Sequence, residues 1–600
     1  MMENVFSARV EALRALMREK GWDIVILTGS DPHASEYPAP RWKQVEWLSG
    51  FTGEAGDLVV TQDHAGLWTD TRYFIQANAQ LAGTGIQLHK MRVPEQVPIP
   101  EWIASLLLDR PVIAVDGLCQ TVSAVRELQT AVPSAVIAPV PDLLSPLWAE
   151  RPAIPCTPII TLGEDLSGES REARLHWLRK WMILQEVDAV LLTALDQIAW
   201  LLNVRGADVE YNPVVISYLL VTMDQACWFV RKDSFAEPDE ETLSSFEELL
   251  SDEVTLCDYQ EVALALSTFV GEDVDRIFVD PGSLNMYLRN CLEENGYSVV
   301  EGPSPVPLRK AVKNPVELDG MREAHLEDGL AVEKFLYWLE GQAGQVDEWE
   351  AACKLQQFRA AIPGYRGDSF ETISAYGPGA ALPHYVTPRT GAPLLEPHGL
   401  YLVDSGGPYL FGTTDITRTV PLGPCSALER EDYTLVLRGH IDLAMSVFPA
   451  GTAGCQLDLA ARAPLWQTRR NFGHGTGHGV GFFLNVHEGP QDIRQNFNAQ
   501  PLLPGMVTSD EPGIYREGMH GVRHESLLLT REAGRNDFGT WYAFEVLTLC
   551  HIDTSCLVRD LLTPDELAWL NAYNERVFRT LSPRLPAPVA AWLREKTRPA

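Results

Sequence analysis

Long apolar runs are missing from this 600-residue sequence, and basic residues are scarce relative to acidic ones. No stretch approaches the roughly 18 consecutive apolar residues that a membrane-spanning helix needs, which excludes a membrane span. There are 48 lysines and arginines against 81 aspartates and glutamates, so the formal net charge is −33. Because a phosphate backbone requires a basic surface, we expect no nucleic-acid partner. The hydrophobic and charged fractions, 46% and 22%, are those of an ordinary globular protein.

CxxC motifs are also absent, although the sequence has ten cysteines. Scattered cysteines in so long a chain exclude a zinc framework or a dense disulfide framework. The N-terminal segment MMENVFSARVEALRALMREKG alternates charged and apolar residues at helical spacing and lacks the continuous apolar core of a signal peptide. It predicts an amphipathic helix. We therefore expect a cytoplasmic protein with no membrane partner.

The first half of the sequence contains the same order of segments twice. GWDIVILT at Gly21 resembles EVDAVLLT at Glu186, and three further pairs follow in order: WLSGFTG with WLLNVRG, LVVTQD with LLVTMD, and IAVD with IFVD. The offsets between partners lie between 153 and 165 residues. Each copy alternates strand-like apolar runs with helical stretches, so we predict two related α/β domains.

Proline-rich segments mark the boundaries of these copies. PAIPCTP begins at Pro152 and GPSPVP begins at Gly302, and such stretches are typical of linkers. The predicted domains are residues 1–155, residues 156–312 as a repeat of the first, and residues 313–600. The third region begins with a long helical pattern that starts at Asn314 and runs to about Glu340.

Two aspartates of the third region flank a turn. Asp404 and Asp415 lie on strand-like runs at either side of a segment rich in glycine and proline. An antiparallel hairpin would set the two carboxylates at cross-strand distance, where like charges repel. Each aspartate could be satisfied separately at a strand end, but a cation between them is the more economical explanation.

Two glutamates repeat this geometry. Glu511 and Glu525 lie at equal distances from Gly518, which predicts a second hairpin. An apolar run follows Glu525 directly, so its carboxylate is expected to be buried. A buried carboxylate must be paired, bound to metal or protonated, because isolated burial of its charge costs several kcal/mol.

Three histidines follow one another in a glycine-rich stretch. GHGTGHGVG contains His474 and His478, and NVHEGP contains His487. So many glycines exclude a stable helix and indicate tight turns or a close approach of the backbone. The Gly-Lys-Ser/Thr ending of a P-loop is missing, and no strand–helix context supports a dinucleotide motif. Three histidines within 14 residues favour a functional site over separate core histidines.

Four carboxylates and one imidazole make a ligand set suited to hard or borderline divalent ions such as Mn²⁺, Co²⁺ or Zn²⁺. Four negative ligands exceed what one ion needs but suit two ions about 3.5–4 Å apart that share carboxylates and a water. The predicted chemistry is metal-assisted hydrolysis. No G-x-S-x-G elbow or HExxH helix offers a rival mechanism.

These motifs, in this order, resemble the pita-bread metallopeptidase family that includes methionine aminopeptidase, prolidase and aminopeptidase P. VDSGG, TTDITRT, GHGTGHGVG, NVHEGP, DEPGIY and RHE all fall within residues 400–525. The resemblance implies an α/β (α+β) fold in which two related creatinase-like N-terminal domains precede a pita-bread catalytic domain. It also implies two divalent metal ions per chain, with Mn²⁺ expected and Zn²⁺ or Co²⁺ as alternatives. Carried over by motif, the metal ligands are Asp404, Asp415, His478, Glu511 and Glu525.

The ligands would divide between the two ions. By the resemblance, Asp415 and Glu525 would bridge both ions, and Asp404 would hold one of them. His478 and Glu511 would hold the other.

Segments outside the ligand motifs extend the resemblance to the three-domain Xaa-Pro aminopeptidases of this family. They include DPHASEY, WTDTRY and YNP in the first half and FEVLTL and WLNAY near the C-terminus. By this resemblance the protein would be a homodimer that removes the N-terminal residue from peptides with proline in second position.

Accessory roles also follow from the resemblance. Glu511 would act as the proton shuttle, and His474 would stabilise the oxyanion or hold the carbonyl. His384 and His487 would line the proline side of the site and contact the peptide backbone. Arg523 would orient a carboxylate ligand.

Two positions carry an open question. Arg72 of the first domain would either reach the substrate or form a structural salt bridge. His524 departs from the family pattern, because an apolar residue is usual between the arginine and the glutamate. It would alter the packing or add a titrating group beside the metals.

Two alternatives to the aminopeptidase stand at this stage. A prolidase would restrict the same chemistry to dipeptides, whereas a pita-bread protein without catalysis would be a binding module, and a charge of −33 would suit a basic partner. The three-domain length favours the aminopeptidase over prolidase. The full set of ligands and accessory histidines argues against a pure binding module.

Overall fold

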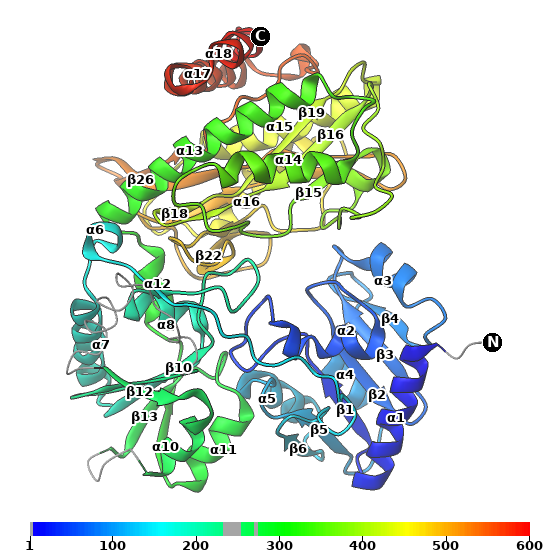
Figure 1. Cartoon of the computed structure of the whole chain (residues 1–600), viewed down its shortest axis with the longest axis vertical. Helices are drawn as coiled ribbons and strands as arrows, with labels where there is room; N and C mark the ends of the chain where they lie inside the picture. Colours follow the sequence, from blue (N-terminus) through cyan, green and yellow to red (C-terminus); the bar gives the residue numbers. More distant parts are fainter. Residues whose placement is uncertain (1–3, 232–253, 269–273) are drawn as a thin grey trace. The chain divides into compact units, whose positions relative to one another are not determined.

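The computed structural model of the chain describes residues 4–231, 254–268 and 274–600. It divides into two compact units: residues 1–163 with 169–306, and residues 164–168 with 307–600. Figure 1 shows both units with their elements labelled. In the described part of the chain, no helix has the length and apolarity that crossing a membrane requires. All ten cysteines lie in that part, and no disulfide joins any of them there.

Two six-stranded sheets with the same strand order form the first unit. The orders are β4-β3-β2-β1-β5-β6 and β12-β11-β10-β8-β13-β14. In the first sheet the strands are β1 Ile24–Leu27, β2 Asp57–Thr61, β3 Ala65–Thr69, β4 Gln87–Lys90, β5 Val112–Asp116 and β6 Val136–Val140. In the second they are β8 Ala189–Leu192, β10 Ser217–Thr222, β11 Ala226–Val230, β12 Val254–Asp258, β13 Arg276–Val279 and β14 Ser298–Glu301.

The sequence repeat corresponds to equivalent places in these sheets. In one sheet β1 pairs antiparallel with β2 and parallel with β5, and in the other β8 pairs in the same way with β10 and β13. These strands contain three of the matched segments. Every residue of β1 and β8 is buried, as expected for central strands covered on both faces.

Helices accompany each sheet of the first unit. Around the first sheet they are α1 Val5–Lys20, α2 Gln44–Ser49, α3 Phe74–Gln80, α4 Ile99–Ser105 and α5 Val122–Ala131. Around the second they are α7 Arg171–Gln185, α8 Leu195–Leu202, α10 Val262–Thr268 and α11 Met286–Glu294, and a short pair of strands is β7 Ile160–Thr161 with β9 Val204–Arg205. Helix α1 confirms the predicted N-terminal helix and begins after Asn4, whose side chain accepts a hydrogen bond from the Phe6 amide. Residues 1–3 of that prediction lie outside the described residues.

Side-chain contacts join the two halves of the first unit. The buried His33 ring contacts the Thr193 carbonyl through Nδ1 and the Tyr259 hydroxyl through Nε2, at 2.9 Å each. An isolated bridge also pairs Thr121 with Asn285. The repeat therefore folds as one unit with a polar, hydrogen-bonded contact between its copies.

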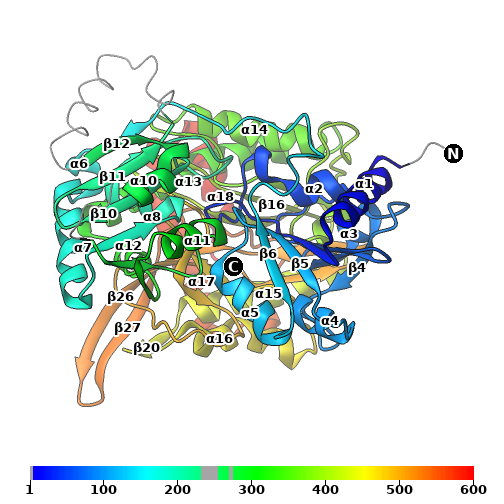
Figure 2. The same ribbon diagram turned by 90° about the horizontal axis from the view of Figure 1, so that it is seen from below.

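The second unit is built on two sheets. The three-stranded sheet has the order β15-β16-β19, with β15 Ile373–Tyr376, β16 Leu400–Ser405 and β19 Ile416–Pro421. The six-stranded sheet has the order β20-β27-β26-β23-β21-β22, with β20 Val447–Pro449, β21 Gly477–Gly479, β22 Glu488–Ile493, β23 Val507–Asp510, β26 Ser526–Asn536 and β27 Gly539–Val546. Two short hairpins complete the strands: β17 Pro408–Tyr409 with β18 Gly412–Thr413, and β24 Gly513–Arg516 with β25 His520–Arg523. The ends of β26 and β27 extend away from this unit as a long hairpin (Figure 2).

The second unit also contains helices. They are α6 Glu164–Ser167, α12 Val306–Ala311, α13 Pro315–Glu340, α14 Glu348–Ala360, α15 Ala427–Ala444, α16 Gly454–Gln467, α17 Pro564–Leu581 and α18 Ala587–Lys596. Of these, α14, α15 and α16 contact strands β15, β25 and β22, respectively. Helix α13 confirms the predicted long helix and starts with an Asn314 capping box followed by Pro315. One apolar cluster, which includes Tyr433, Leu437 and Leu570, joins α15 to α17.

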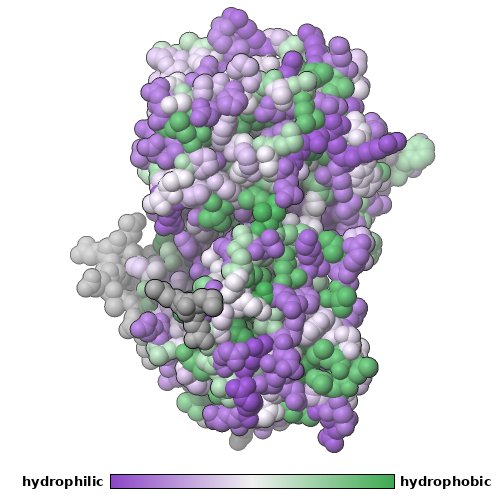
Figure 3. Space-filling view, turned by 90° about the vertical axis from the view of Figure 1, so that its right-hand side faces the viewer, coloured by the Kyte–Doolittle hydropathy of each residue, from purple (hydrophilic) through white to green (hydrophobic). Residues whose placement is uncertain are grey.

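The observed architecture confirms the predicted fold class, with two related α/β domains followed by a different α/β domain. On the face shown in Figure 3, hydrophilic residues are spread over the surface and hydrophobic residues form scattered groups. This distribution is consistent with a strongly acidic composition in which most charged residues are solvated.

Candidate metal centre

The two sheets of the second unit bring the predicted ligands together. Asp404 lies near the end of β16, and Asp415 immediately precedes β19, its antiparallel partner. Asp404 is paired with Thr417, and the small β17–β18 hairpin continues the same antiparallel register toward the turn by pairing Pro408 with Thr413. The two aspartates were predicted to lie roughly opposite each other across a hairpin; in the structure they are offset by two residues and lie at the same end of the strand pair.

The second predicted hairpin is confirmed by β24 and β25. These strands pair Gly513 with Arg523, so Glu511 and Glu525 lie just beyond the open end of the hairpin. Gly518 in the turn has a φ of 70°, a conformation that favours glycine. The Glu525 amide donates to the Thr417 carbonyl at 3.1 Å, which ties this glutamate to the sheet that carries the aspartates.

The glycine-rich stretch allows a close approach of backbones, as its composition predicted. A Cβ added at Gly477 would lie 1.9 Å from the Ser509 carbonyl oxygen, and one at Gly479 would lie 2.2 Å from the Glu488 carbonyl oxygen. Strand β21 can therefore fit between β22 and β23 only because these positions lack side chains. This fit places His478 beside Glu511.

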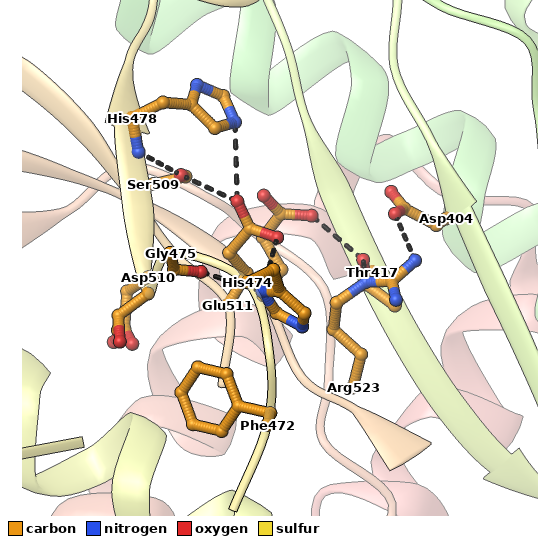
Figure 4. Close-up of polar contacts among 12 residues, drawn as sticks. Asp404, Thr417, Phe472, His474, Gly475, His478, Ser509, Asp510, Glu511 and Arg523 are labelled. Atoms are coloured by element: carbon orange, nitrogen blue, oxygen red, sulfur yellow. Dashed lines mark hydrogen bonds and ion pairs between the residues drawn. The ribbon is translucent and has the colours of Figure 1, made fainter. Parts of the chain in front are cut away.

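Several of the predicted ligands lie close together, and Figure 4 labels Asp404, His478 and Glu511 among them. The Nε2 atom of His478 lies 3.4 Å from an Asp415 carboxylate oxygen and 3.4 Å from a Glu511 carboxylate oxygen. Ligand atoms of Asp415, His478 and Glu525 all lie within 4.8 Å of one another. Ser509 accepts a hydrogen bond from the His478 amide at 2.9 Å and donates to Glu511 at 3.3 Å.

Burial and mutual repulsion dominate the electrostatics of this cluster. Burial raises the pKa of Glu511 to about 7, and the neighbouring Asp415 and Asp404 also raise it, while His478 and Arg523 lower it. Burial, followed by the charges of Asp415, Asp404 and Glu511, raises the pKa of Glu525 well above its usual value. The pKa of Asp404 is also raised, first by burial. The carboxylates of this cluster therefore repel one another, and additional positive charge would stabilise their ionised forms.

The orientation of His478 fits metal binding. Its Nδ1 lies 2.9 Å from the Gly479 carbonyl oxygen and can donate to it, while Nε2 faces the carboxylates of Asp415 and Glu511. A metal ion bound at Nε2 would therefore be within reach of both carboxylates. Within the described part of the chain, the buried Oδ1 of Asp404 also has no hydrogen-bond partner. These residues therefore fit a pair of divalent cations.

Arg523 lies where a residue that orients Asp404 should lie. The guanidinium donates to Asp404 at 2.5 Å, to the Tyr515 hydroxyl at 2.7 Å and to the Thr417 hydroxyl at 3.2 Å. Thr417 in turn donates to Glu525 at 2.8 Å. One buried cation therefore fixes a ligand from each sheet.

Sequence reasoning assigned no role to Tyr515, Thr417 or Ser509. Two of them stood inside the recognised motifs DEPGIY and TTDITRT. The alternation of side chains along a strand could have found Thr417, because it lies on the same face as Asp415. No comparable sequence signal identified Ser509, whose role depends on the neighbouring strand.

The accessory histidines lie in this unit at different depths. His474 accepts a hydrogen bond at Nε2 from Tyr515 at 2.7 Å, and its Nδ1 contacts the Gly475 carbonyl at 2.7 Å. Burial first, then Arg523, lowers the pKa of His474 well below its usual value, so this ring is neutral; His384 lowers it further. The His487 ring lies 4.3 Å from the His478 ring between centroids.

His524 and Arg72, whose roles the sequence left open, both have well-defined neighbours in the structure. His524 is fully buried, its ring packs edge-on against Tyr433 at 4.5 Å, and burial lowers its pKa well below the usual value. It is therefore a neutral packing residue in this structure. Arg72 donates to both carboxylate oxygens of Asp70 at 2.9 and 2.8 Å, so it makes the salt bridge that was one of its two predicted roles.

Family models match four successive parts of the chain. The description "Metallopeptidase family M24" matches residues 319–532, and the C-terminal region of that peptidase family matches residues 540–600. Two models of a creatinase/prolidase N-terminal domain match residues 9–147 and 150–317. The matched regions follow the two copies of the repeat and the unit that carries the ligand cluster.

Named relatives match over the whole length. The chain is 36% identical to "Aminopeptidase P1" of Lotus japonicus over 100% of both sequences. It is 38% identical to "Probable Xaa-Pro aminopeptidase P" of Pyricularia oryzae over 99% of both. Among solved structures, X-prolyl aminopeptidase from Caenorhabditis elegans, titled a cytosolic enzyme with a di-nuclear active site, matches with a TM-score of 0.93 and 33% identity over 99% of this chain and 100% of that chain.

A shorter structure shares the fold only. Xaa-Pro dipeptidase from Bacillus anthracis covers 64% of this chain at 23% identity, with a TM-score of 0.52. The full-length matches are therefore to aminopeptidases of three-domain length. The chain belongs to the aminopeptidase P branch of metallopeptidase family M24.

Proposed function

We propose that the protein is a metallo-exopeptidase that hydrolyses the bond between an N-terminal residue and a following proline. The observation that carries this proposal is the convergence of Asp415, His478, Glu511 and Glu525, with Asp404 near enough for its charge to act on both glutamates. It occurs in a chain similar over its full length to proteins named aminopeptidase P. Two divalent ions fit the cluster, and Mn²⁺ is the proposed metal. A cytoplasmic location is proposed with it, supported by the cytosolic description of the Caenorhabditis elegans enzyme, and a homodimer is proposed from the family resemblance alone.

In this proposal the five ligands are distributed between two metal ions. Asp415 and Glu525 would be shared between the ions, Asp404 would hold one ion, and His478 and Glu511 the other. Bound ions would polarise the scissile carbonyl and lower the pKa of water. Arg523 favours the ionised form of Asp404 and orients its carboxylate through a 2.5 Å hydrogen bond.

Glu511 is suited to proton transfer. Its pKa of about 7, raised chiefly by burial, lies near neutrality, where a group can both accept and release a proton. In the proposed mechanism Glu511 takes a proton from the attacking water and delivers it to the leaving proline nitrogen. That nitrogen belongs to a tertiary amide without an N–H, so the enzyme cannot hold the substrate by an amide hydrogen at this bond.

The histidines would hold the peptide. His474 is neutral and would donate to the scissile carbonyl from Nε2 in the tautomer that carries the ring proton on that atom, giving up the hydrogen bond that Nε2 accepts from Tyr515. His384 and His487 would line the proline side. Arg72 would contribute to substrate binding only if it left Asp70, to which it is paired in the structure.

Prolidase activity is the alternative, and peptide length separates the two. We expect cleavage of a tripeptide Xaa-Pro-Yaa and of longer peptides, with release of the first residue alone. Cleavage confined to Xaa-Pro dipeptides would show that the protein is a prolidase and not an aminopeptidase. Glu511→Ala should abolish cleavage while the circular dichroism spectrum stays unchanged, and retained full activity would contradict its role.

A further inference from the structure

A buried glutamate of α14 is hydrogen-bonded to the residues at both ends of the segment that carries His384. Glu348 is the first residue of this helix, is 0% exposed, and makes no ion pair in the described part of the chain. Its carboxylate accepts hydrogen bonds from the Tyr376 amide at 2.6 Å and from the Tyr385 hydroxyl at 2.7 Å. One carboxylate therefore holds both the start and the end of residues 377–384.

The space around this carboxylate is closely fitted. A Cβ at Gly379, within the short helix η4 (Gly377–Ala381), would lie 3.1 Å from the Tyr385 ring and 3.3 Å from a Glu348 oxygen. The Tyr385 ring also packs against an apolar cluster that includes Ile373 and Leu402. Removal of the carboxylate would leave the Tyr376 amide and the Tyr385 hydroxyl without their acceptor.

The same segment is pressed against the strand that carries Arg523. A Cβ at Gly521 of β25 would lie 1.6 Å from the Ala380 carbonyl oxygen, so the two backbones touch. Beyond the segment, the Thr387 hydroxyl bonds to the backbone of Ser374 at 3.0 and 3.1 Å. Residues 377–384 are thus fixed to α14, to β15 and to β25.

His384 belongs to this segment, which touches β25, the strand that also carries Arg523. Its own position depends on the two tyrosine contacts, because His384 precedes Tyr385 directly in the chain. The geometry points to Glu348 as a positioning residue that sets His384 against the proline side of the substrate through Tyr385 and the Tyr376 backbone.

This inference rests on the proposed role of His384, and a double-mutant cycle tests both separately. Glu348→Ala should raise KM for an Xaa-Pro tripeptide about tenfold, because misplaced contact groups weaken binding. Glu348→Gln should restore wild-type KM, since the amide can accept from the Tyr376 N–H and donate to the Tyr385 oxygen. Glu350→Ala, at an exposed position of the same helix, is the matched control and should leave KM unchanged.

The cycle is completed in a His384→Ala background. There Glu348→Ala should add no further loss, because both changes remove one contact. A tenfold loss of the same size in both backgrounds, or a loss of bound metal in Glu348→Ala, would overturn the positioning role. If His384→Ala alone left KM unchanged, the proposed role of His384 would fail instead, and with it the inference.

Discussion

Raising the pH should destabilise the metal-free protein, and Glu511 should account for much of this effect. Its pKa rises from 4.5 to about 7 in the folded chain because the carboxylate is buried among other acidic groups. A carboxyl with a raised pKa binds more protons in the folded state than in the unfolded state, so the free energy of unfolding falls as pH rises across that window. Its stability contribution is fully present below about pH 4.5 and is lost by about pH 7.

The size of the effect follows from the two pKa values. A difference of about 2.5 corresponds to about 3 kcal/mol of unfolding free energy for this one group. For a domain of this size such a change lowers the melting temperature by roughly 6 °C. Glu525 and Asp404, whose pKa values are also raised, add to the loss in the same direction.

Scanning calorimetry of the chelator-treated protein between pH 5 and pH 8 measures this dependence. Glu511→Gln should show a smaller slope than the wild type, because Glu525 and Asp404 keep their share of it, and should melt higher than the wild type at pH 8, both without metal. The exposed Glu517 lies in the turn of the same hairpin, and Glu517→Gln should keep the wild-type slope. Added Mn²⁺ should restore stability most strongly at high pH, where the ligands are deprotonated. A metal-free melting temperature that is flat or rises from pH 5 to pH 8 would refute the reasoning.

Three further predictions address the residues around the cluster. Arg523→Lys should lower Mn²⁺ affinity about 10- to 100-fold in titration calorimetry, because lysine cannot hold Asp404, Tyr515 and Thr417 together; unchanged affinity would contradict this. His524→Ile should keep full activity and raise stability to urea by about 1 kcal/mol, since both ring nitrogens of His524 are buried without hydrogen bonds; a large loss of activity would give His524 a catalytic part instead. Gly477→Ala should destabilise the protein by about 3 kcal/mol through its clash with Ser509, whereas Gly475→Ala meets only ordinary contacts and serves as control; equal effects of the two would rule out close approach as the reason for the glycine.

The sequence predicted the candidate metal ligands better than it predicted the residues that orient them. The periodicity of apolar runs and the repeat predicted β1, β2 and β5 together with their counterparts β8, β10 and β13, because local burial patterns determine central strands. The glutamate hairpin was also predicted, since its turn glycine and equal spacing are local features. The exact register of the aspartate hairpin was not predicted: its turn is centred between Leu410 and Phe411, so Asp404 faces Thr417, and nothing in a single strand reveals its partner.

Contacts between distant segments account for what the sequence left open. Tyr515 and Ser509 acquire their roles from strands and loops that pack beside them in space. Glu348 lies far from every ligand motif in the sequence, and only the folded chain shows its contact with Tyr385. The burial of His524 likewise depends on α15, which supplies Tyr433. Such positions need three-dimensional neighbours before their residue types acquire meaning.

Metal content measured together with cleavage of an Xaa-Pro tripeptide decides whether this chain is a dinuclear Xaa-Pro aminopeptidase. We expect about two divalent ions per chain and release of the first residue alone, with no cleavage after chelation and recovery on adding Mn²⁺. A Xaa-Ala tripeptide of the same length is the control and should be cleaved poorly. A chain that binds no divalent ion, or that leaves the Xaa-Pro bond intact when loaded with metal, would contradict the proposed function.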